Sequence, residues 1–167
     1  MKSSLMMDFT IDKEKKTVHV KRVFAADRDL VWAAWTEPNL LDRWWAPRPW
    51  LARTKAMDFC QGGRRLYAML GPEGEEHWAL ADYTSITPKS NFQYLDAFCD
   101  ADGKINEEFP RSDWDVSFMD QGNGQTAVHV AIKHQKWSDL EMIIEMGFKE
   151  GFTMALGHLD ELLEEQS

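Results

Sequence analysis

The sequence predicts a single α+β domain in which a curved antiparallel sheet of about seven strands surrounds a long C-terminal helix. Short segments of alternating apolar and polar residues fill the region between about residues 53 and 134. The C-terminal segment instead carries apolar residues at steps of three and four. A length of 167 residues suits one domain with one core, so residues 1–167 are expected to form a single unit.

The core should begin with one strand and one helix. Residues 17–24 alternate and are rich in β-branched side chains, which predicts a strand with Val18, Val20 and Phe24 on one face. Asp27 follows as a candidate N-cap, because its carboxylate can accept a hydrogen bond from a free amide of the first helical turn. We therefore expect a helix from this residue onward.

Prolines limit this helix and the next one. The first helix should stop near Pro38, and a second short helical piece should cover residues 39–45. Pro47 and Pro49 follow directly, and proline cannot continue a helix because it lacks an amide hydrogen and restricts the residue before it.

The middle region is divided by clusters of Gly, Pro, Asn and Asp, which mark turns. Short connections of this kind join antiparallel neighbours, and six strands are expected here. The clearest pair comprises residues 114–118 and 126–132, which read as a hairpin turned at Gly122, Asn123 and Gly124.

Residues 138–165 predict one long amphipathic helix. Ser138 and Glu141 have the spacing of a capping box, which would fix the start of this helix. Gly147 and Gly151 lie one turn apart beside the apolar stripe, where the missing side chains allow another element to approach. The helix needs a broad apolar partner, and the sheet is the available one.

The composition argues against several classes of partner. The 28 acidic and 19 basic residues give a formal charge of −9, which opposes binding to nucleic acids and to anionic membrane surfaces. No apolar run approaches the roughly 20 residues of a spanning helix, so we expect a cytoplasmic protein. Cys60 and Cys99 match no metal-ligand spacing and should both be free thiols in a reducing compartment.

A family resemblance is carried by the tryptophan-rich segment and by matches that follow in register. The first group is Arg22-Val23-Phe24, Ala26, Val31-Trp32, Ala34-Trp35-Thr36-Glu37-Pro38, Leu41, Arg43-Trp44-Trp45 and Pro47. The second is Gly62-Gly63, Tyr67, Met69, Gly71-Pro72, Gly74, Thr87-Pro88, Gly124, Thr126, Gly147 and Phe148. Together they resemble the activator of Hsp90 ATPase homologues within the START/Bet v 1-like superfamily, over about residues 15–165.

This resemblance implies a helix-grip fold with a mostly apolar cavity between the sheet and the long helix. Members bind lipids, hormones or polyketides, or catalyse ring closures, so the fold alone does not select a function. The eukaryotic co-chaperones of the group resemble this chain only in their C-terminal domain. An Hsp90-type chaperone is therefore a less supported partner than a small hydrophobic molecule.

Aromatic and polar residues are the candidates for lining such a cavity. They are Trp35, Trp44, Trp50, Arg65, Tyr67, Met69, Tyr94, Trp114, Phe148, Phe152 and His158. The alternative is that the eight tryptophans and nine phenylalanines fill the space as ordinary core.

Arg65 shares one face of its strand with Tyr67 and Met69, where the family usually has an aromatic residue. If it points inward, it needs a carboxylate such as Asp96 or Asp115, or an acidic group on a ligand. The plainer alternative is that Arg65 lies at a strand end and reaches water.

No catalytic residue, metal or organic cofactor is expected. The five histidines form no ligand pair, and His129 and His134 should face opposite sides of one strand. The expected function is therefore binding of a small hydrophobic molecule, and an inward-pointing Arg65 leads to the hypothesis that this molecule carries an acidic group. A cyclase or aromatase-type enzyme would instead need Arg65, Tyr67, Tyr94 and His158 to converge, and a protein-interaction module would need an exposed patch at Trp44, Trp45 and Trp50.

Overall fold

A computed structural model describes residues 7–166 of the chain. It contains eight strands and four helices within that range: β1 (Met7–Asp12), β2 (Thr17–Phe24), α1 (Arg28–Thr36), α2 (Pro38–Leu41), β3 (Leu51–Met57), β4 (Arg64–Leu70), β5 (Glu76–Thr87), β6 (Asn91–Cys99), β7 (Asp113–Gly122), β8 (Gln125–Lys133), α3 (Trp137–Glu145) and α4 (Phe148–Gln166).

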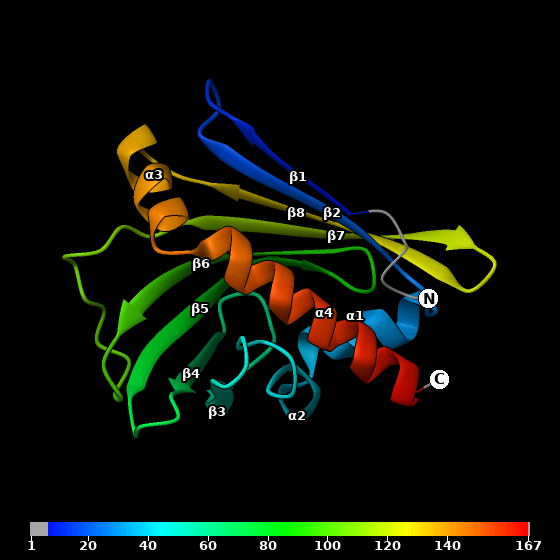
Figure 1. Cartoon of the computed structure of the whole chain (residues 1–167), viewed down its shortest axis with the longest axis horizontal. Coiled ribbons are helices and arrows are strands. Elements are labelled where there is room, and N and C mark those ends of the chain that lie inside the picture. The colour runs from blue at the N-terminus through cyan, green and yellow to red at the C-terminus, as the bar shows by residue number, and fades with distance from the viewer. Residues whose placement is uncertain (1–6, 167) are drawn as a thin grey trace.

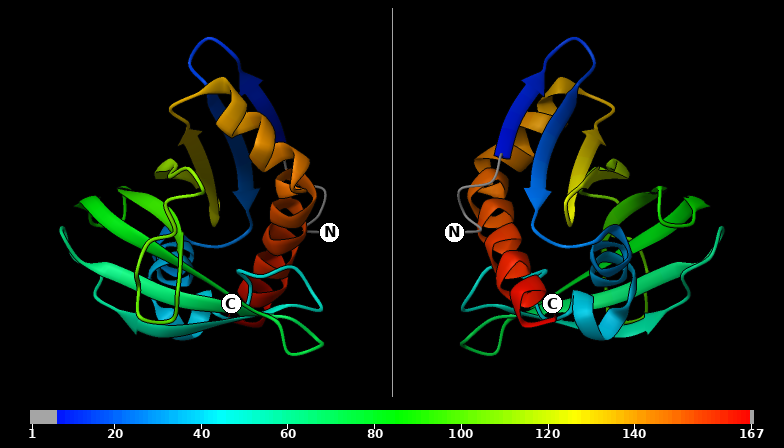
Figure 2. Two further views of the ribbon diagram at one scale, coloured as in Figure 1. Left: turned by 90° about the vertical axis from the view of Figure 1, so that its left-hand side faces the viewer. Right: turned by 90° about the vertical axis from the view of Figure 1, so that its right-hand side faces the viewer.

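All eight strands form one antiparallel sheet in the order β1-β2-β8-β7-β6-β5-β4-β3. The pairing of β2 with β8 places an early strand of the chain beside its last strand (Figure 1). The sheet is bent, and Figure 2 shows α3 and α4 lying along its open side. This is the helix-grip arrangement, in which the C-terminal helices face the inner side of the sheet.

The core lies where α4 faces the inward side chains of the sheet. Leu156 and Leu159 of α4 are almost fully buried, as are Val18 and Val20 of β2. Apolar residues recur at every second position in β2 and at steps of three and four in the last helix. These predicted patterns therefore mark the buried faces. The predicted hairpin is also confirmed, because β7 and β8 pair up to Gly122 and Gln125 across a two-residue turn.

The sheet has one strand more than expected. β1 pairs with β2 along the sheet edge and buries only part of its side chains. Its alternation is visible in the sequence, but the turn after it consists of residues 13–16, which include no Gly, Pro or Asn. Lys16 takes the positive φ of 53° that such residues usually provide, and this is why the hairpin was not predicted.

The long C-terminal helix was predicted as one piece, but it is divided into α3 and α4. Gly147 has a φ of 89°, a left-handed conformation that breaks the helix between the two parts. The predicted capping box is also wrong, because α3 starts at Trp137 with Lys136 as N-cap and without a side-chain capping bond.

The first two helices differ from the prediction in detail. Asp27 does occupy the N-cap position of α1 with extended backbone, but its side chain makes no capping hydrogen bond. The second helix, predicted over residues 39–45, is only the single turn of α2, which begins at Pro38. Residues 42–50 continue as an irregular segment that lies between α2 and β3 and helps to form the site described below.

The described residues offer few other functional features. Cys60 and Cys99 are both free. Residues 7–166 include no helix with the length and apolar character needed to cross a membrane. Within the same range no three His, Cys, Asp or Glu side chains gather in a way that could hold a metal ion.

Candidate functional site

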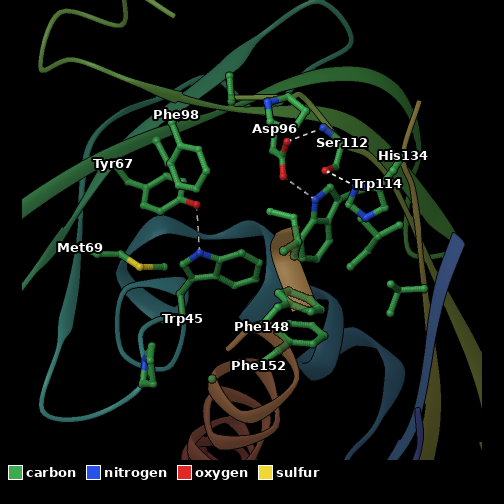
Figure 3. Close-up of a pocket in the computed structure, with 18 residues that line it drawn as sticks. Trp45, Tyr67, Met69, Asp96, Phe98, Ser112, Trp114, His134, Phe148 and Phe152 are labelled. Carbon is green, nitrogen blue, oxygen red and sulfur yellow. Dashed lines mark hydrogen bonds between the residues drawn. The ribbon is translucent and has the colours of Figure 1, made fainter. Parts of the chain in front are cut away.

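A cavity of about 230 Å³ lies between the inner face of the sheet and the helices α3 and α4 (Figure 3). Its walls come from strands β2 and β4–β8, from both C-terminal helices and from the segment after α2. The lining residues are Val18, Trp45, Pro47, Tyr67, Met69, Ala79, Asp96, Ala97, Phe98, Pro110, Ser112, Trp114, Ile132, His134, Ile143, Phe148, Gly151 and Phe152.

Aromatic rings form much of the wall. The rings of Phe148 and Phe152 stack with their centroids 5.2 Å apart, because they lie one turn apart on α4. Trp114 of β7 meets Phe152 edge-on at 5.7 Å, and Trp45 lies 5.8 Å from Trp114. These contacts fix the rings as a continuous apolar surface around the cavity.

The α4 side of the cavity depends on two glycines. Gly147 ends α3 and so sets the position at which Phe148 begins α4. Gly151 lies between the two phenylalanines in sequence and lines the cavity opposite Pro47. A Cβ atom at Gly151 would be 3.7 Å from Cγ of Pro47, which is van der Waals contact, so the helix and this proline lie close together at this wall.

One end of the cavity is polar and is built around Asp96 of β6. Its Oδ1 accepts a hydrogen bond from the backbone N–H of Ser112 at 2.7 Å, and its Oδ2 accepts one from Nε1 of Trp114 at 2.8 Å. Figure 3 shows the carboxylate pointing toward the space between Phe98 and Trp114. Burial raises the pKa of Asp96, although the two donated hydrogen bonds and nearby Arg111 oppose this effect.

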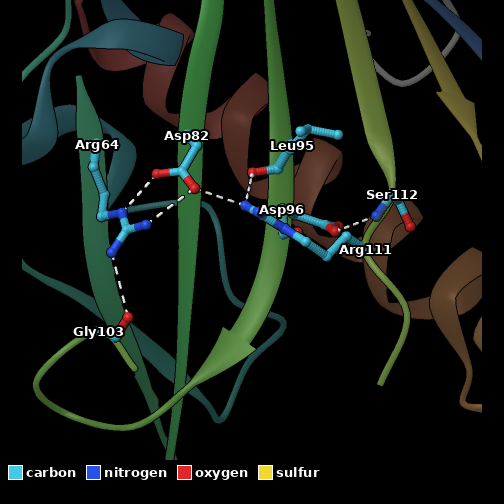
Figure 4. Close-up of polar contacts among 7 residues, drawn as sticks. All are labelled: Arg64, Asp82, Leu95, Asp96, Gly103, Arg111 and Ser112. Atoms are coloured by element: carbon cyan, nitrogen blue, oxygen red, sulfur yellow. Dashed lines mark hydrogen bonds and ion pairs between the residues drawn. The ribbon is translucent and has the colours of Figure 1, made fainter. Parts of the chain in front are cut away.

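Arg111 is close to Asp96 but does not form an ion pair with it. Its Nε donates to the backbone oxygen of Asp96 at 2.9 Å, and its Nη2 reaches the carboxylate of Asp82 at 2.7 Å (Figure 4). Arg64 also binds Asp82, at 2.6 Å. Burial by itself would raise the pKa of Asp82, but the hydrogen bonds from the two arginines lower it. Both Arg64 and Arg111 therefore form their ion pairs with Asp82.

His134 completes the polar end. Its Nδ1 lies 3.2 Å from Oγ of Ser112, and its Nε2 is buried without a hydrogen-bond partner among the described residues. Burial lowers the pKa of His134, so its imidazole is neutral at pH 7. His129 faces the other side of β8, where its Nε2 is 3.0 Å from Nδ1 of His19.

Tyr67 forms the opposite wall of the cavity. Its hydroxyl oxygen accepts a hydrogen bond from Nε1 of Trp45 at 3.1 Å, which ties β4 to the segment after α2. Burial raises the pKa of Tyr67, so the phenol is protonated at neutral pH. The cavity thus has protonated or neutral polar groups at Tyr67, Ser112 and His134, and one acid at Asp96.

Arg65 does point inward, but it is outside this cavity. It lines a separate chamber of about 20 Å³ with Trp35 and Tyr94, on the other side of Tyr67. Its side chain is only 3% exposed and pairs with Asp42 at 3.2 Å. Neither Asp96 nor Asp115, the partners considered from the sequence, makes this contact. The partner lies in the irregular segment after α2, where no sequence periodicity indicates which way a side chain points.

The sequence-predicted candidates therefore fall into three groups. Tyr67, Met69, Trp114, Phe148 and Phe152 line the main cavity. Trp35, Arg65 and Tyr94 line only the small chamber. Trp44, Trp50 and His158 line neither of the two.

Contacts elsewhere explain the third group. Trp44 is fully buried and donates from Nε1 to the backbone oxygen of Ala34 at 2.8 Å, so it belongs to the core beneath α1. Trp50 packs against His77, with ring centroids 5.1 Å apart. His158 accepts a hydrogen bond at Nε2 from the backbone N–H of Arg48. Trp44 therefore cannot contribute to an exposed tryptophan patch, and His158 does not converge with Arg65.

Sequence reasoning missed the polar end of the cavity. Asp96 follows Tyr94 by two residues and so shares its inward face, which was the available signal. Ser112 and His134 lie just outside β7 and β8, where alternation no longer indicates a face. Trp45 was assigned to a helix end, although its ring contacts Trp114 and Tyr67 inside the site.

Comparisons with known proteins agree with this geometry. Residues 25–164 match the family model described as activator of Hsp90 ATPase homolog 1-like protein. Protein Ms6760 from Mycobacterium smegmatis is 28% identical with a TM-score of 0.86, over 95% of this chain and 96% of that one. A protein from Arthrobacter aurescens is 27% identical with a TM-score of 0.89, over 95% and 91%. NE0264 from Nitrosomonas europaea is 25% identical with a TM-score of 0.80, over 93% and 98%. No curated protein matches the chain.

Proposed function

The chain belongs to the family of activator of Hsp90 ATPase homolog 1-like proteins, and we propose that it binds a small hydrophobic molecule in the cavity between the sheet and the C-terminal helices. The observation that carries this proposal is an aromatic cavity of about 230 Å³ in a chain rich enough in tryptophan and phenylalanine to fill it. Trp35 and Trp44 do not fill this cavity, because their rings pack against each other beneath α1, with centroids 4.7 Å apart.

The energy of such a space supports the same function. A ligand that covers this mostly apolar wall gains about 25 cal/mol for each Å² of apolar surface that it removes from water. Ordered water is a poor filler where most of the wall is apolar, because each water needs two to four polar partners. A hydrophobic ligand can pack against this apolar wall, and its binding would stabilise the fold.

The two alternative functions lack a matching site. An interaction module would need Trp44, Trp45 and Trp50 together on the surface, but Trp44 is fully buried and Trp45 packs against Trp114. A cyclase would need His158 near Arg65 and Tyr67, but His158 binds the backbone of Arg48. We therefore propose binding alone.

A pair of glycines on α4 provides a matched test. Gly151→Leu would place a side chain into the cavity beside Pro47, whereas Gly157→Leu adds the same side chain where nothing lies within 4 Å of the new Cβ. Both changes replace a helical glycine and should favour the helix by up to about 1 kcal/mol. Binding of 2-phenylethanol can be followed by tryptophan fluorescence and by chemical shifts of the indole N–H groups.

We expect saturable binding to the wild-type protein and to Gly157→Leu with similar Kd values, and binding at least tenfold weaker to Gly151→Leu. Equal binding by the two leucine variants, or no saturable binding to the wild type, would show that the cavity is not the binding site. Native mass spectrometry of protein purified from its own cells should also detect a retained small molecule.

A further inference from the structure

Among the described residues that line the cavity, one is an ionisable acid and none is an arginine or a lysine. Asp96 is the acid, and the histidine that accompanies it, His134, is neutral. The other polar groups are the hydroxyls of Ser112 and Tyr67. A ligand in this space therefore meets one carboxylate and no cation among the described residues that line it.

The carboxylate of Asp96 still has capacity to accept hydrogen bonds. An ionised carboxylate offers about four acceptor positions, and Ser112 and Trp114 occupy one on each oxygen. No described lysine or arginine forms an ion pair with it. The nearby cation, Arg111, donates a hydrogen bond to the backbone oxygen of Asp96 and forms its ion pair with Asp82 (Figure 4).

The surroundings favour a positive charge next to this acid. Aromatic faces attract a cation within about 6 Å, most strongly where both are shielded from water. Figure 3 shows Phe98, Trp114 and Trp45 around the space into which the Asp96 carboxylate points. A partly buried acid beside aromatic rings is a combination that binds a protonated amine both by hydrogen bonding and by attraction to the rings.

We propose that the ligand of this cavity is a hydrophobic amine whose ammonium group donates a hydrogen bond to Asp96. This inference rests on the proposed function and adds the chemical class of the ligand. It replaces the acidic ligand expected from the sequence, because that expectation needed Arg65 to lack a partner, and Asp42 is its partner. An acidic ligand would instead be repelled by Asp96 and by the net charge of −9.

Three probes of similar size and different charge test this proposal. They are 2-phenylethylamine, which is a cation at pH 7.5, 2-phenylethanol, which is neutral, and 3-phenylpropionate, which is an anion. We expect the amine to bind the wild-type protein at least tenfold more tightly than the alcohol, and the acid to bind most weakly. The amine should also shift the Nε1–H resonance of Trp114 more than the alcohol does, because this group shares Oδ2 of Asp96.

Asp96→Asn should weaken amine binding at least tenfold and leave the Kd of the alcohol within about threefold. Asp113→Asn is the matched control, because it removes the same charge from an exposed residue of the neighbouring strand β7. It should change neither Kd. The wild-type series and the Trp114 resonance keep the test decisive even if Asp96→Asn fails to fold.

The outcomes separate this inference from the proposed function. If the alcohol or the acid binds the wild type as tightly as the amine, the amine inference is overturned while the cavity remains a binding site. If Asp96→Asn folds and keeps the amine preference, the inference is likewise wrong. If none of the three probes binds saturably, both the inference and the proposed function fail.

Discussion

The buried pair of Arg65 and Asp42 should be essential for stability and unnecessary for binding. Arg65 is 3% exposed and its guanidinium lies 4.0 Å from the ring centroid of Tyr67. Asp42 accepts from Arg65 at 3.2 Å and also from the backbone N–H and the hydroxyl of Thr54, at 2.8 and 2.6 Å. Replacing Asp42 by alanine would leave a buried cation without its counter-charge.

The expected cost follows from this burial. Removing one partner of a buried ion pair typically destabilises a protein by about 3–5 kcal/mol, because the other charge stays desolvated. The side chain of Asp42 is 24% exposed, so water reaches the pair and we expect the lower end, about 3 kcal/mol. Arg65→Met should cost about 2 kcal/mol through the lost attraction to the ring of Tyr67.

A double-mutant cycle measures the coupling. Urea unfolding of the wild type, Asp42→Ala, Arg65→Met and the double variant gives four free energies of unfolding. We expect the double variant to be about 2 kcal/mol more stable than the sum of the two single effects predicts. With methionine at position 65, the loss of the Asp42 carboxylate no longer leaves a buried charge without a partner. The exposed pair of Arg43 and Glu165 is the control, and Glu165→Ala should change stability by less than about 0.5 kcal/mol.

Two results would refute this reasoning. An Asp42→Ala cost below about 1 kcal/mol would mean that Arg65 can turn toward water. A large loss of 2-phenylethanol affinity in a folded Arg65→Met protein would mean that the small chamber takes part in binding. We expect its Kd to remain within about threefold of the wild-type value, because Arg65 does not line the main cavity.

Two further predictions concern the frame of the cavity. Gly147→Ala should lower the free energy of unfolding by about 1–2 kcal/mol, because φ at this position is 89°. Gly157→Ala should raise it by up to about 1 kcal/mol, because nothing lies within 4 Å of the new Cβ and alanine favours the helix. Equal effects of the two variants in urea unfolding would contradict this. Burial lowers the pKa of folded His134 below its ordinary value of about 6.5, so the unfolded state binds more protons and stability falls as the pH drops below about 6.5. His134→Gln should therefore lose less stability than the wild type between pH 7.5 and 5.5, and parallel losses would show that this histidine is not responsible.

The fold could be predicted because its buried faces have clear periods. Val18 and Val20 alternate with the less buried His19 and Lys21 along β2, and Leu156 and Leu159 repeat along α4 at helical spacing. These patterns determine which faces must leave water, and that requirement is enough to place the helix against the sheet. The helix break escaped prediction, because a glycine beside an apolar stripe is equally compatible with close packing and with the left-handed conformation that Gly147 adopts.

The candidate site was predicted only where a single element determines it. Tyr67 and Met69 share an inward face of β4, and Phe148 and Phe152 share a face of α4, so their place in the cavity follows from local periodicity. The partner of Arg65 could not be found in this way. Asp42 lies in irregular structure 23 residues away, and its contact depends on how that segment packs against β4.

The same reasoning explains why the tryptophans do not plug the cavity. Trp35 comes from α1 and Trp44 from the segment after α2. Their rings pack against each other at one end of the sheet, where Trp35 also contacts Phe118 and Phe92. Trp114 and Phe148 come from β7 and α4 at the other end, where the rings stand edge to face at 6.1 Å and form a wall. Asp96 holds the indole of Trp114 in this wall through its Oδ2. The acid that we propose to select the ligand therefore also keeps an aromatic ring out of the space that the ligand would occupy.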